Sequence, residues 1–270
     1  MEPVRQTALV TGPTSGIGHG IACILAERGF DLFLVSRNDE KLAAVKNDLE
    51  SRHGISVTTM VQDLSQHGAA KRVFDEAQAR GIEISILVNN AGFGIGGELT
   101  DMKPTAVAQM IQLNIMTPTE LCLLFGREMK RKRSGRILNL SSTAAYQPTP
   151  YIAAYGGTKS YILNFSEALA KEMEGYGVVV TCLVPGPTDT SFFDRTGIEG
   201  LGEKQTGLWA KKKRMSPRSV ARIGVDALAA GRLTTIAGLR NFLLASANRL
   251  VPRSLSATLS KWMIKRASDL

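Results

Sequence analysis

The stretch Thr11-Gly12-Pro13-Thr14-Ser15-Gly16-Ile17-Gly18 decides the fold class of this chain. It follows an apolar run, Thr7–Val10, that reads as a strand, and it opens an amphipathic run, Ile17–Glu27, that reads as a helix. Glycines let the backbone come close to a ligand, and the first N–H groups of a helix are free to bind a phosphate. Between a first strand and a first helix, such a turn indicates a dinucleotide site rather than a turn that is glycine-rich by chance.

The first two thirds of the chain alternate short apolar runs with longer amphipathic runs. This pattern predicts an α/β fold with a mostly parallel sheet of about seven strands, and right-handed crossovers make it one doubly wound Rossmann-type domain with helices on both faces. The expected strands are Thr7–Val10, Asp31–Ser36, Ser56–Val61, Ile84–Asn89, Arg136–Leu140, Val178–Val184 and a last one near Leu233–Ala237. The expected helices are Ile17–Glu27, Glu40–Ser51, Gly68–Arg80, Thr105–Arg133 and Ala153–Glu174.

Composition bounds the class of protein. The chain has 270 residues, 44% of them hydrophobic, which suits one large domain, and its net charge of +9 favours an anionic ligand or surface. The basic residues are not interleaved with stacking aromatics, so we do not expect nucleic acid as a partner. Cys23, Cys122 and Cys182 are odd in number and far apart, which predicts core packing in a reducing compartment rather than disulfides or a zinc site.

The amino terminus runs straight into a strand without the charged-then-apolar pattern of a signal peptide. No uncharged apolar run reaches the roughly 18 residues of a spanning helix. From the sequence we therefore expect a cytoplasmic protein.

The second strand ends at Ser36-Arg37. An acidic residue at this place would accept hydrogen bonds from the ribose hydroxyls of NAD. This chain offers a hydroxyl and a guanidinium instead, which suit the 2′-phosphate of NADP(H). The alternative is that Arg37 is a solvated loop charge, and we expect the phosphate contact.

The segment Tyr155-Gly156-Gly157-Thr158-Lys159 places a phenol and an ammonium on one face of an expected helix. A tyrosine has an ordinary pKa of about 10, and a nearby cation favours the phenolate, so we expect Lys159 to lower the pKa of Tyr155. This spacing occurs by chance in many helices, and its meaning depends on the rest of the chain.

The motifs taken together resemble those of the short-chain dehydrogenase/reductase family. The first turn has the spacing GxxxGxG rather than GxGxxG, and Asn89-Asn90-Ala91-Gly92 follows the fourth strand. Ser142 lies thirteen residues before Tyr155. The resemblance covers about residues 5–190. It departs from the usual family pattern at four positions, which are Pro13, Thr14, Gly157 and Thr158.

The resemblance implies roles for individual residues. It implies a catalytic tetrad of Asn114, Ser142, Tyr155 and Lys159, and no metal. In this family Asp63-Leu64 would contact the adenine ring, and the turn Pro185–Thr190 would contact the nicotinamide. The implied cofactor-binding residues are Gly12, Thr14, Ser15, Gly16, Ile17, Gly18, Ser36, Arg37, Asp63, Leu64, Asn90, Ala91, Gly92, Tyr155, Lys159, Pro185, Gly186, Thr188 and Thr190.

The function that the resemblance implies is NADP(H)-dependent hydride transfer between a carbonyl and a secondary alcohol on a lipophilic small molecule, such as a ketone, a hydroxysteroid-like compound or an acyl substrate. Two alternatives stay open, an NAD-linked alcohol dehydrogenase and a non-catalytic nucleotide-binding regulatory or scaffold protein. A non-catalytic relative would be expected to have lost Tyr155, Lys159 or Ser142. The segment 190–216, with Phe192 and Trp209 among its apolar residues, is expected to contact the substrate, either as a closing lid or as a packed loop.

The carboxyl-terminal part of the sequence differs from the rest. We expect a catalytic domain over residues 1–238 and a helical extension over 239–270, which Pro252 divides into two basic amphipathic helices. Three roles are open for the extension: contact with a membrane surface, contact with another subunit, or cover for the substrate cleft. The family resemblance also implies a homo-oligomer, a dimer or a tetramer.

Overall fold

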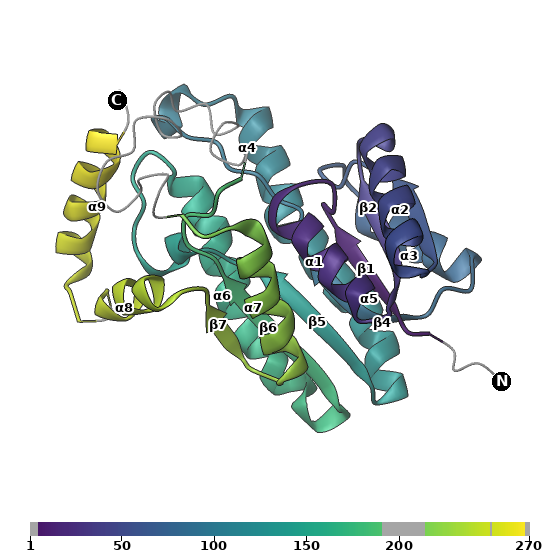
Figure 1. Cartoon of the computed structure of the whole chain (residues 1–270). Helices are drawn as coiled ribbons and strands as arrows, with labels where there is room; N and C mark the ends of the chain where they lie inside the picture. Colours follow the sequence, from purple (N-terminus) through teal and green to yellow (C-terminus); the bar gives the residue numbers. More distant parts are fainter. Residues whose placement is uncertain (1–4, 191–213, 249, 268–270) are drawn as a thin grey trace.

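A computed structural model of the chain describes residues 5–190, 214–248 and 250–267. Seven strands form one sheet in the order β3-β2-β1-β4-β5-β6-β7, and all of these pairings are parallel (Figure 1). The strands are β1 Thr7–Thr11, β2 Asp31–Ser36, β3 Val57–Val61, β4 Ile84–Asn89, β5 Gly135–Leu140, β6 Val178–Val184 and β7 Thr234–Ile236. The helices are α1 Gly16–Glu27, α2 Asp39–His53, α3 Ala69–Ala79, α4 Pro104–Ile111, α5 Thr117–Lys132, α6 Ala153–Met173, α7 Pro217–Ala229, α8 Leu239–Ala247 and α9 Arg253–Ala267.

The strand order reverses direction at β1. The chain first builds outward from β1 through β2 to β3, then returns to pair β4 with the other side of β1. Leu9, for example, lies between Phe33 of β2 and Leu87 of β4. In an open parallel sheet, ligands bind beyond the carboxyl ends of the strands at such a reversal. The expected doubly wound α/β fold is therefore confirmed, and its binding edge is located.

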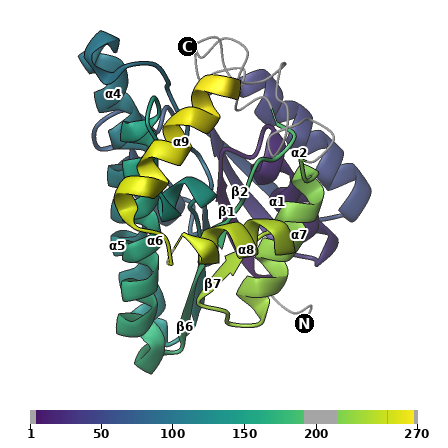
Figure 2. The ribbon, with the colours of Figure 1, turned by 90° about the vertical axis from the view of Figure 1, so that its left-hand side faces the viewer.

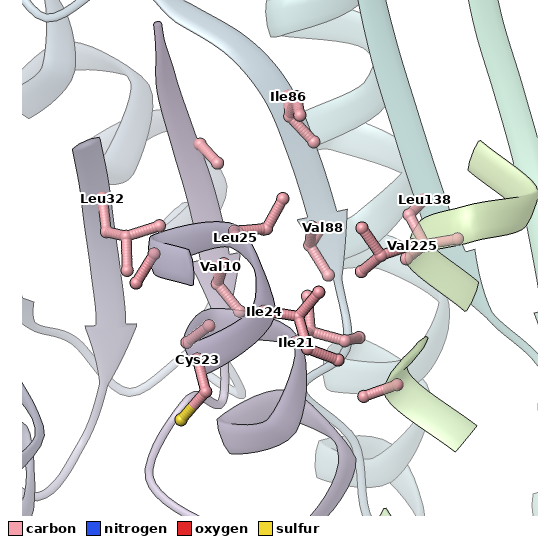
Figure 3. Close-up of a cluster of buried hydrophobic side chains, with 14 of the residues drawn as sticks. Val10, Ile21, Cys23, Ile24, Leu25, Leu32, Ile86, Val88, Leu138 and Val225 are labelled. Atoms are coloured by element: carbon pink, nitrogen blue, oxygen red, sulfur yellow. The ribbon is translucent and has the colours of Figure 1, made fainter. Parts of the chain in front are cut away.

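Alternating residues of each strand send their side chains into two separate cores, one on each face of the sheet. On one face, Ala8 and Val10 pack with the apolar sides of α1, α2 and α7. Figure 3 shows Val10 beside Ile24 of α1 in this core. On the other face, Leu9 and Phe33 pack with α3, α5 and α6. Burial of both faces explains why the strands read as continuous apolar runs. The three cysteines are free and buried, as expected for core residues.

Most element boundaries fall within one or two residues of the expectation, with one larger difference. The region 105–133 was expected to be one long helix. The structure instead has α4, then a π-helical turn over Gln112–Met116, then α5. A π turn inserts one extra residue into the helical ladder, so it changes which side chains face inward, and such turns are frequent at functional sites. Here it holds Asn114, whose side chain is buried.

The carboxyl-terminal helices α8 and α9 form an outer layer beside the edge strand β7 (Figures 1 and 2). As expected, Pro252 lies between them, directly before α9. The segment that precedes α6 holds both helices, since Asn248 donates to Gln147 and Ile264 packs against Tyr151 and Ile152. The division of the chain at residue 238 stays a prediction, and α8 begins immediately after it. None of the helices in the described ranges is long and apolar enough to cross a membrane.

Candidate active site

The glycine turn between β1 and α1 is compressed against its neighbours. Gly12 has a φ of 66°, a left-handed conformation that favours glycine, and its N–H donates to Val35 of β2 over 2.9 Å. At Gly18 a Cβ atom would overlap the side-chain amide of Asn90 and the carbonyl of Gly12. The side chain of Ser15 makes no capping bond at the start of α1. The turn is therefore a close-fitting backbone surface at a helix N-terminus, which fits the phosphates of a dinucleotide.

Residues at the end of β4 hold this turn in place. The hydroxyl of Thr11 donates to Val88 and accepts from the N–H groups of Asn90 and Ala91, both over 3.0 Å. The side-chain amide of Asn90 donates to the carbonyls of Thr11 over 2.9 Å and Gly12 over 3.0 Å. Asn90, expected as a cofactor-binding residue, therefore positions the turn by tying β1 to β4.

The ends of β2 and β3 bring the expected adenosine-binding residues together. Ser36 is the last residue of β2, and Arg37 follows it with an exposed side chain. Asp63 follows β3, and its carboxylate accepts from the N–H of Ser65 over 2.9 Å and from its hydroxyl over 2.7 Å. Burial alone would raise the pKa of Asp63, but the hydrogen bonds from Ser65 and Gln66 and the nearby charge of Arg37 hold it below its usual value. The carboxylate is therefore ionised at neutral pH and is already hydrogen-bonded within its own turn.

Leu64 is buried and reaches the other half of the site through its backbone. Its carbonyl accepts from the hydroxyl of Thr117 at the start of α5, over 2.7 Å. This bond links the turn after β3 to the helix that follows Asn114.

The turn after β6 lies against the glycine turn. The methyl group of Thr190 is 3.0 Å from the position that a Cβ would take at Gly16. Thr188 is buried, and its hydroxyl donates to the carbonyl of Gly186 over 2.9 Å. Pro185 accepts from the N–H of Thr143 over 2.9 Å, which connects this turn to the one after β5. Residues expected to contact opposite ends of a dinucleotide thus share one edge of the sheet.

Asn114 is fixed by three hydrogen bonds. Its carbonyl oxygen accepts from the N–H of Phe93 over 3.2 Å. Its amide donates to the carbonyl of Phe93 over 2.9 Å and to the hydroxyl of Thr158 over 3.1 Å. The side chain therefore joins the loop after β4 to helix α6, the helix that carries Tyr155 and Lys159.

Ser142 and Tyr155 form the centre of the site. Ser142 starts the short turn after β5, and its hydroxyl accepts from the N–H of Ala144 over 3.2 Å. Tyr155 lies in the first turn of α6 and is 9% exposed. Burial raises the pKa of Tyr155 to about 12, and a hydrogen bond with the side chain of Ser142 acts in the opposite direction with a smaller effect.

Lys159 lies one helical turn after Tyr155 and is 7% exposed. Its ammonium nitrogen Nζ donates to the carbonyl of Leu140 over 2.9 Å and lies 5.8 Å from the centre of the Tyr155 ring. Burial lowers the pKa of Lys159 to about 8. The expectation that Lys159 lowers the pKa of Tyr155 is therefore not met, because burial is the largest cause acting on the phenol and only the hydrogen bond with Ser142 opposes it.

Several positioning residues were missed from the sequence. Thr158, noted only as a departure from the family pattern, donates to the carbonyl of Tyr155 over 2.7 Å and accepts from Asn114. The hydroxyl of Ser141 donates to the carbonyl of Lys159 over 2.7 Å. Asn241 of α8 lies against Gly186, since a Cβ there would overlap its side-chain amide. Apart from the Thr158–Tyr155 bond within α6, these contacts join different elements of the fold, so no local pattern marks them.

The expected substrate segment 190–216 lies mostly outside the described residues, which stop at Thr190 and resume at Arg214. Met215, which lies in the described part of this segment, forms an isolated parallel bridge with Thr188 in the turn after β6.

The fold and site together define an α/β protein of the Rossmann type with a dinucleotide-binding edge. Residues 6–198 match the family model of the short chain dehydrogenases. The chain belongs to this family.

Curated relatives and solved structures agree with this assignment. A very-long-chain 3-oxoacyl-CoA reductase of Pyrenophora tritici-repentis is 33% identical over 185 residues, which cover 67% of this chain and 54% of the relative. A 3-oxoacyl-acyl-carrier-protein reductase of Chlamydia muridarum is 30% identical over 77% of this chain and 82% of its own length. The structure of a short-chain dehydrogenase from Sphingobium yanoikuyae in complex with NADPH is similar, with a TM-score of 0.79 and 27% identity over 90% of this chain and 94% of that one. The chain spans a little more than half the length of the first curated relatives that it matches.

Proposed function

We propose that this protein is an NADP(H)-dependent oxidoreductase that interconverts a carbonyl and a secondary alcohol. One observation supports the proposal most directly: Ser142, Tyr155 and Lys159 are clustered at the same sheet edge as the glycine turn. The close-fitting turn suits a dinucleotide, which when bound supplies or accepts the hydride.

In the reducing direction, Tyr155 donates the proton to the substrate oxygen as negative charge develops there. The raised pKa of Tyr155 keeps the phenol protonated at neutral pH, so the donor form is always present. Ser142 hydrogen-bonds the phenol side chain and orients the same oxygen. In the oxidising direction Tyr155 must act as a base, which a raised pKa makes less favourable. The enzyme speeds both directions, so the direction of net turnover follows the equilibrium of the reaction and the ratio of NADPH to NADP+.

Lys159 and Asn114 hold other parts of the site in place. The bond from Lys159 to the carbonyl of Leu140 holds the ammonium beside the phenol, where it suits contact with ribose hydroxyls. Asn114 braces α6 through Thr158 and the loop after β4 through Phe93. Replacement of Tyr155 by Phe should reduce turnover by a factor of about 10² to 10⁴ because it removes the proton and leaves the ring in place.

The preference for NADP(H) rests on Arg37. It is an exposed guanidinium directly after β2, and its charge acts on the ionised Asp63. A similar protein, from Sphingobium yanoikuyae, was solved in complex with NADPH. Titration of both cofactors into the wild-type protein and into Arg37→Asp tests this assignment. The wild type should bind NADPH more tightly and Arg37→Asp should favour NADH, whereas equal affinity of the wild type for both would contradict the proposal.

The substrate class that we propose is a lipophilic carbonyl compound. The names of similar proteins include a 3-oxoacyl-CoA reductase and a 7β-hydroxysteroid dehydrogenase. A panel of ketones, hydroxysteroids and acyl thioesters assayed with NADPH, with Tyr155→Phe as the blank, would identify the class. Cofactor binding without turnover on any member would favour the non-catalytic alternative, and turnover with NAD(H) alone would favour an NAD-linked dehydrogenase.

We also propose a homo-oligomer. Met116 and Leu123 on the α4–α5 side and Tyr161 on α6 are large apolar side chains exposed to solvent, and Tyr161 shares a 3.2 Å hydrogen bond with Thr119 of α5. Sedimentation velocity of the wild type and of Leu123→Glu tests it. We expect a dimer or larger species that the charged variant weakens, and a monomeric wild type at micromolar concentration would contradict the proposal.

A further inference from the structure

Exposed apolar side chains gather on the carboxyl-terminal helices. Within the described residues, eight of the fifteen exposed large apolar side chains fall between residues 239 and 262, less than a tenth of the chain. They are Leu239, Phe242, Leu243, Leu244, Leu250, Leu255, Leu259 and Trp262. Leu250, in the turn between the two helices, is 89% exposed. We call residues 239–248 and 250–265 the C-terminal surface.

Helix α9 has the reverse of the usual pattern for a helix packed on a protein. Its buried positions are Ser256, Ser260 and Ile264, which follow one another at four-residue steps. Its exposed positions include Leu255, Leu259 and Trp262, which share the opposite side. Two serines therefore face the protein while two leucines and a tryptophan face away from it. Within residues 5–190, 214–248 and 250–267, no packing contact accounts for leucines on that side of the helix.

The charge of this part of the chain has one sign. No Asp or Glu occurs from residue 227 to residue 268 of the sequence, whereas Asp226 and Asp269 stand just outside. Arg240 on α8 and Arg253, Lys261 and Lys265 on α9 are exposed. The C-terminal surface thus combines protruding apolar side chains with cations only.

Apolar side chains together with cations favour one of two possible partners for the C-terminal surface, a second copy of the chain or a lipid bilayer. A second copy of the chain bound through a twofold axis would place the same surface on itself, so its cations would face cations. An anionic phospholipid bilayer accepts both features, since leucine and tryptophan side chains enter the headgroup region and cations are attracted to the lipid charge. We propose that the C-terminal surface binds the surface of an anionic phospholipid bilayer.

Helix α9 packs against the segment that leads into α6, the helix that carries Tyr155 and Lys159. Ile264 packs on Tyr151 and Ile152, and the ammonium of Lys265 lies 5.7 Å from the centre of the Tyr151 ring. Tyr151 is four residues before Tyr155. The layer formed by α8 and α9 also lies on one outer side of the molecule in both views (Figures 1 and 2). A bilayer bound there would lie next to the segment that leads into the catalytic helix. The binding itself does not depend on the proposed activity.

Vesicle co-sedimentation of the full-length protein tests the proposal. Vesicles of phosphatidylcholine alone and vesicles with about one third phosphatidylglycerol are compared at about 0.1 M salt, where exposed charges still act over about 10 Å. The protein should sediment with the anionic vesicles and be released at about 0.5 M salt. Absence of binding to anionic vesicles, or equal binding to both kinds, would overturn the proposal.

Two sets of variants separate charge from apolar contact. Arg240→Gln/Lys261→Gln removes two exposed cations and should weaken binding about 30-fold, with Lys41→Gln/Lys46→Gln on the distant α2 as the matched control. Leu255→Ser/Leu259→Ser should also weaken binding, with Val61→Ser on the opposite edge strand as its control. Thermal unfolding by circular dichroism verifies that each variant is folded. Binding unchanged in both test variants would overturn the proposal, as would self-association, with no vesicle binding, that the leucine variant abolishes.

Trp262 offers an independent signal. The chain has two tryptophans, Trp209 and Trp262, so Trp209→Phe leaves only the one on α9. Its fluorescence emission should shift to shorter wavelength with anionic vesicles and stay unchanged with phosphatidylcholine alone. An unchanged emission with both would contradict the insertion of α9.

Discussion

Tyr155 and Lys159 are two buried groups whose environment favours the uncharged form of each. Burial raises the pKa of Tyr155 to about 12 and lowers that of Lys159 to about 8. The four-residue spacing placed them on the same side of one helix, but spacing carries no information about how much water surrounds them. Desolvation depends on the whole fold, and here it is the largest cause of both pKa shifts.

The buried ammonium makes the stability of the protein depend on pH. Between about pH 8 and the ordinary value of 10.5, folded chains bind fewer protons at Lys159 than unfolded chains, so this group's contribution to stability rises with pH across that window. At pH 7 the full cost of burying the charge is present. Lys159→Met should therefore unfold with a free energy about 2 kcal/mol higher than the wild type at pH 7, even after the bond to Leu140 is lost.

Urea unfolding of both proteins between pH 7 and 10.5 measures this difference. The advantage of Lys159→Met should shrink as the pH rises through the window, while its turnover is impaired at every pH. A gap that stays constant with pH would show that the ammonium is not desolvated.

Two adjacent glycines of α6, Gly156 and Gly157, differ in the space around them, and this difference can be tested by substitution. A Cβ at Gly156 would overlap the hydroxyl of Thr149, whereas a Cβ at Gly157 would meet no atom within 4 Å. Gly157→Ala should therefore stabilise the protein by about 0.5–1 kcal/mol through helix propensity, and Gly156→Ala should destabilise it by about 1–3 kcal/mol through overpacking. Thermal unfolding of the two variants compares them directly, and equal shifts would refute the assigned contact.

At the scale of elements, the site is assembled by bonds between the ends of neighbouring strands. Asn90 after β4 holds the turn after β1, and the turns after β5 and β6 are joined by Thr143 and Pro185. Strand order explains these contacts, since β1 pairs with β4 although the paired residues Val10 and Val88 are 78 positions apart in the sequence. The π turn at Asn114 also shapes the site, because it divides a region that reads as one helix in the sequence into α4 and α5.

Asn90→Ala tests the bond between β1 and β4. The change leaves the carbonyls of Thr11 and Gly12 without their side-chain donor, which should lower stability by about 1–3 kcal/mol. It should also weaken NADPH binding, because the glycine turn loses its support. Chemical unfolding and fluorescence titration with NADPH measure the two effects. Unchanged stability with weaker binding would instead favour direct contact of Asn90 with the cofactor.

At the scale of the whole molecule, the carboxyl-terminal helices lie beside the active site rather than apart from it. Asn241 of α8 rests on Gly186 of the turn after β6, and Asn248 donates to Gln147 over 2.8 Å. Ile264 is the buried apolar side chain through which α9 contacts Tyr151 and Ile152.

Ile264→Ala should therefore loosen α9 without unfolding the sheet. Truncation of a buried isoleucine to alanine costs about 2–5 kcal/mol. Here it should lower the free energy of local opening of α9 rather than that of global unfolding. Trypsin should then cleave after Lys261 and Lys265 sooner than in the wild type, while the main thermal transition changes little. Unchanged cleavage together with a large drop in that transition would show that α9 is part of the cooperative core.

Local features of the sequence are enough to predict the α/β class, the order of strands and helices along the chain, the dinucleotide turn and the family. These features are apolar periodicity, glycines at a strand end, and residue types at set spacings. Four features emerge only from the folded chain: the strand order of the sheet, the support of the glycine turn by Asn90, the π turn at Asn114 and the direction of the pKa shift of Tyr155. The tertiary structure also decided that α9 faces the protein with serines and solvent with leucines and tryptophan. These features depend on distant segments meeting and on water being excluded between them, and neither is encoded in any single stretch of the chain.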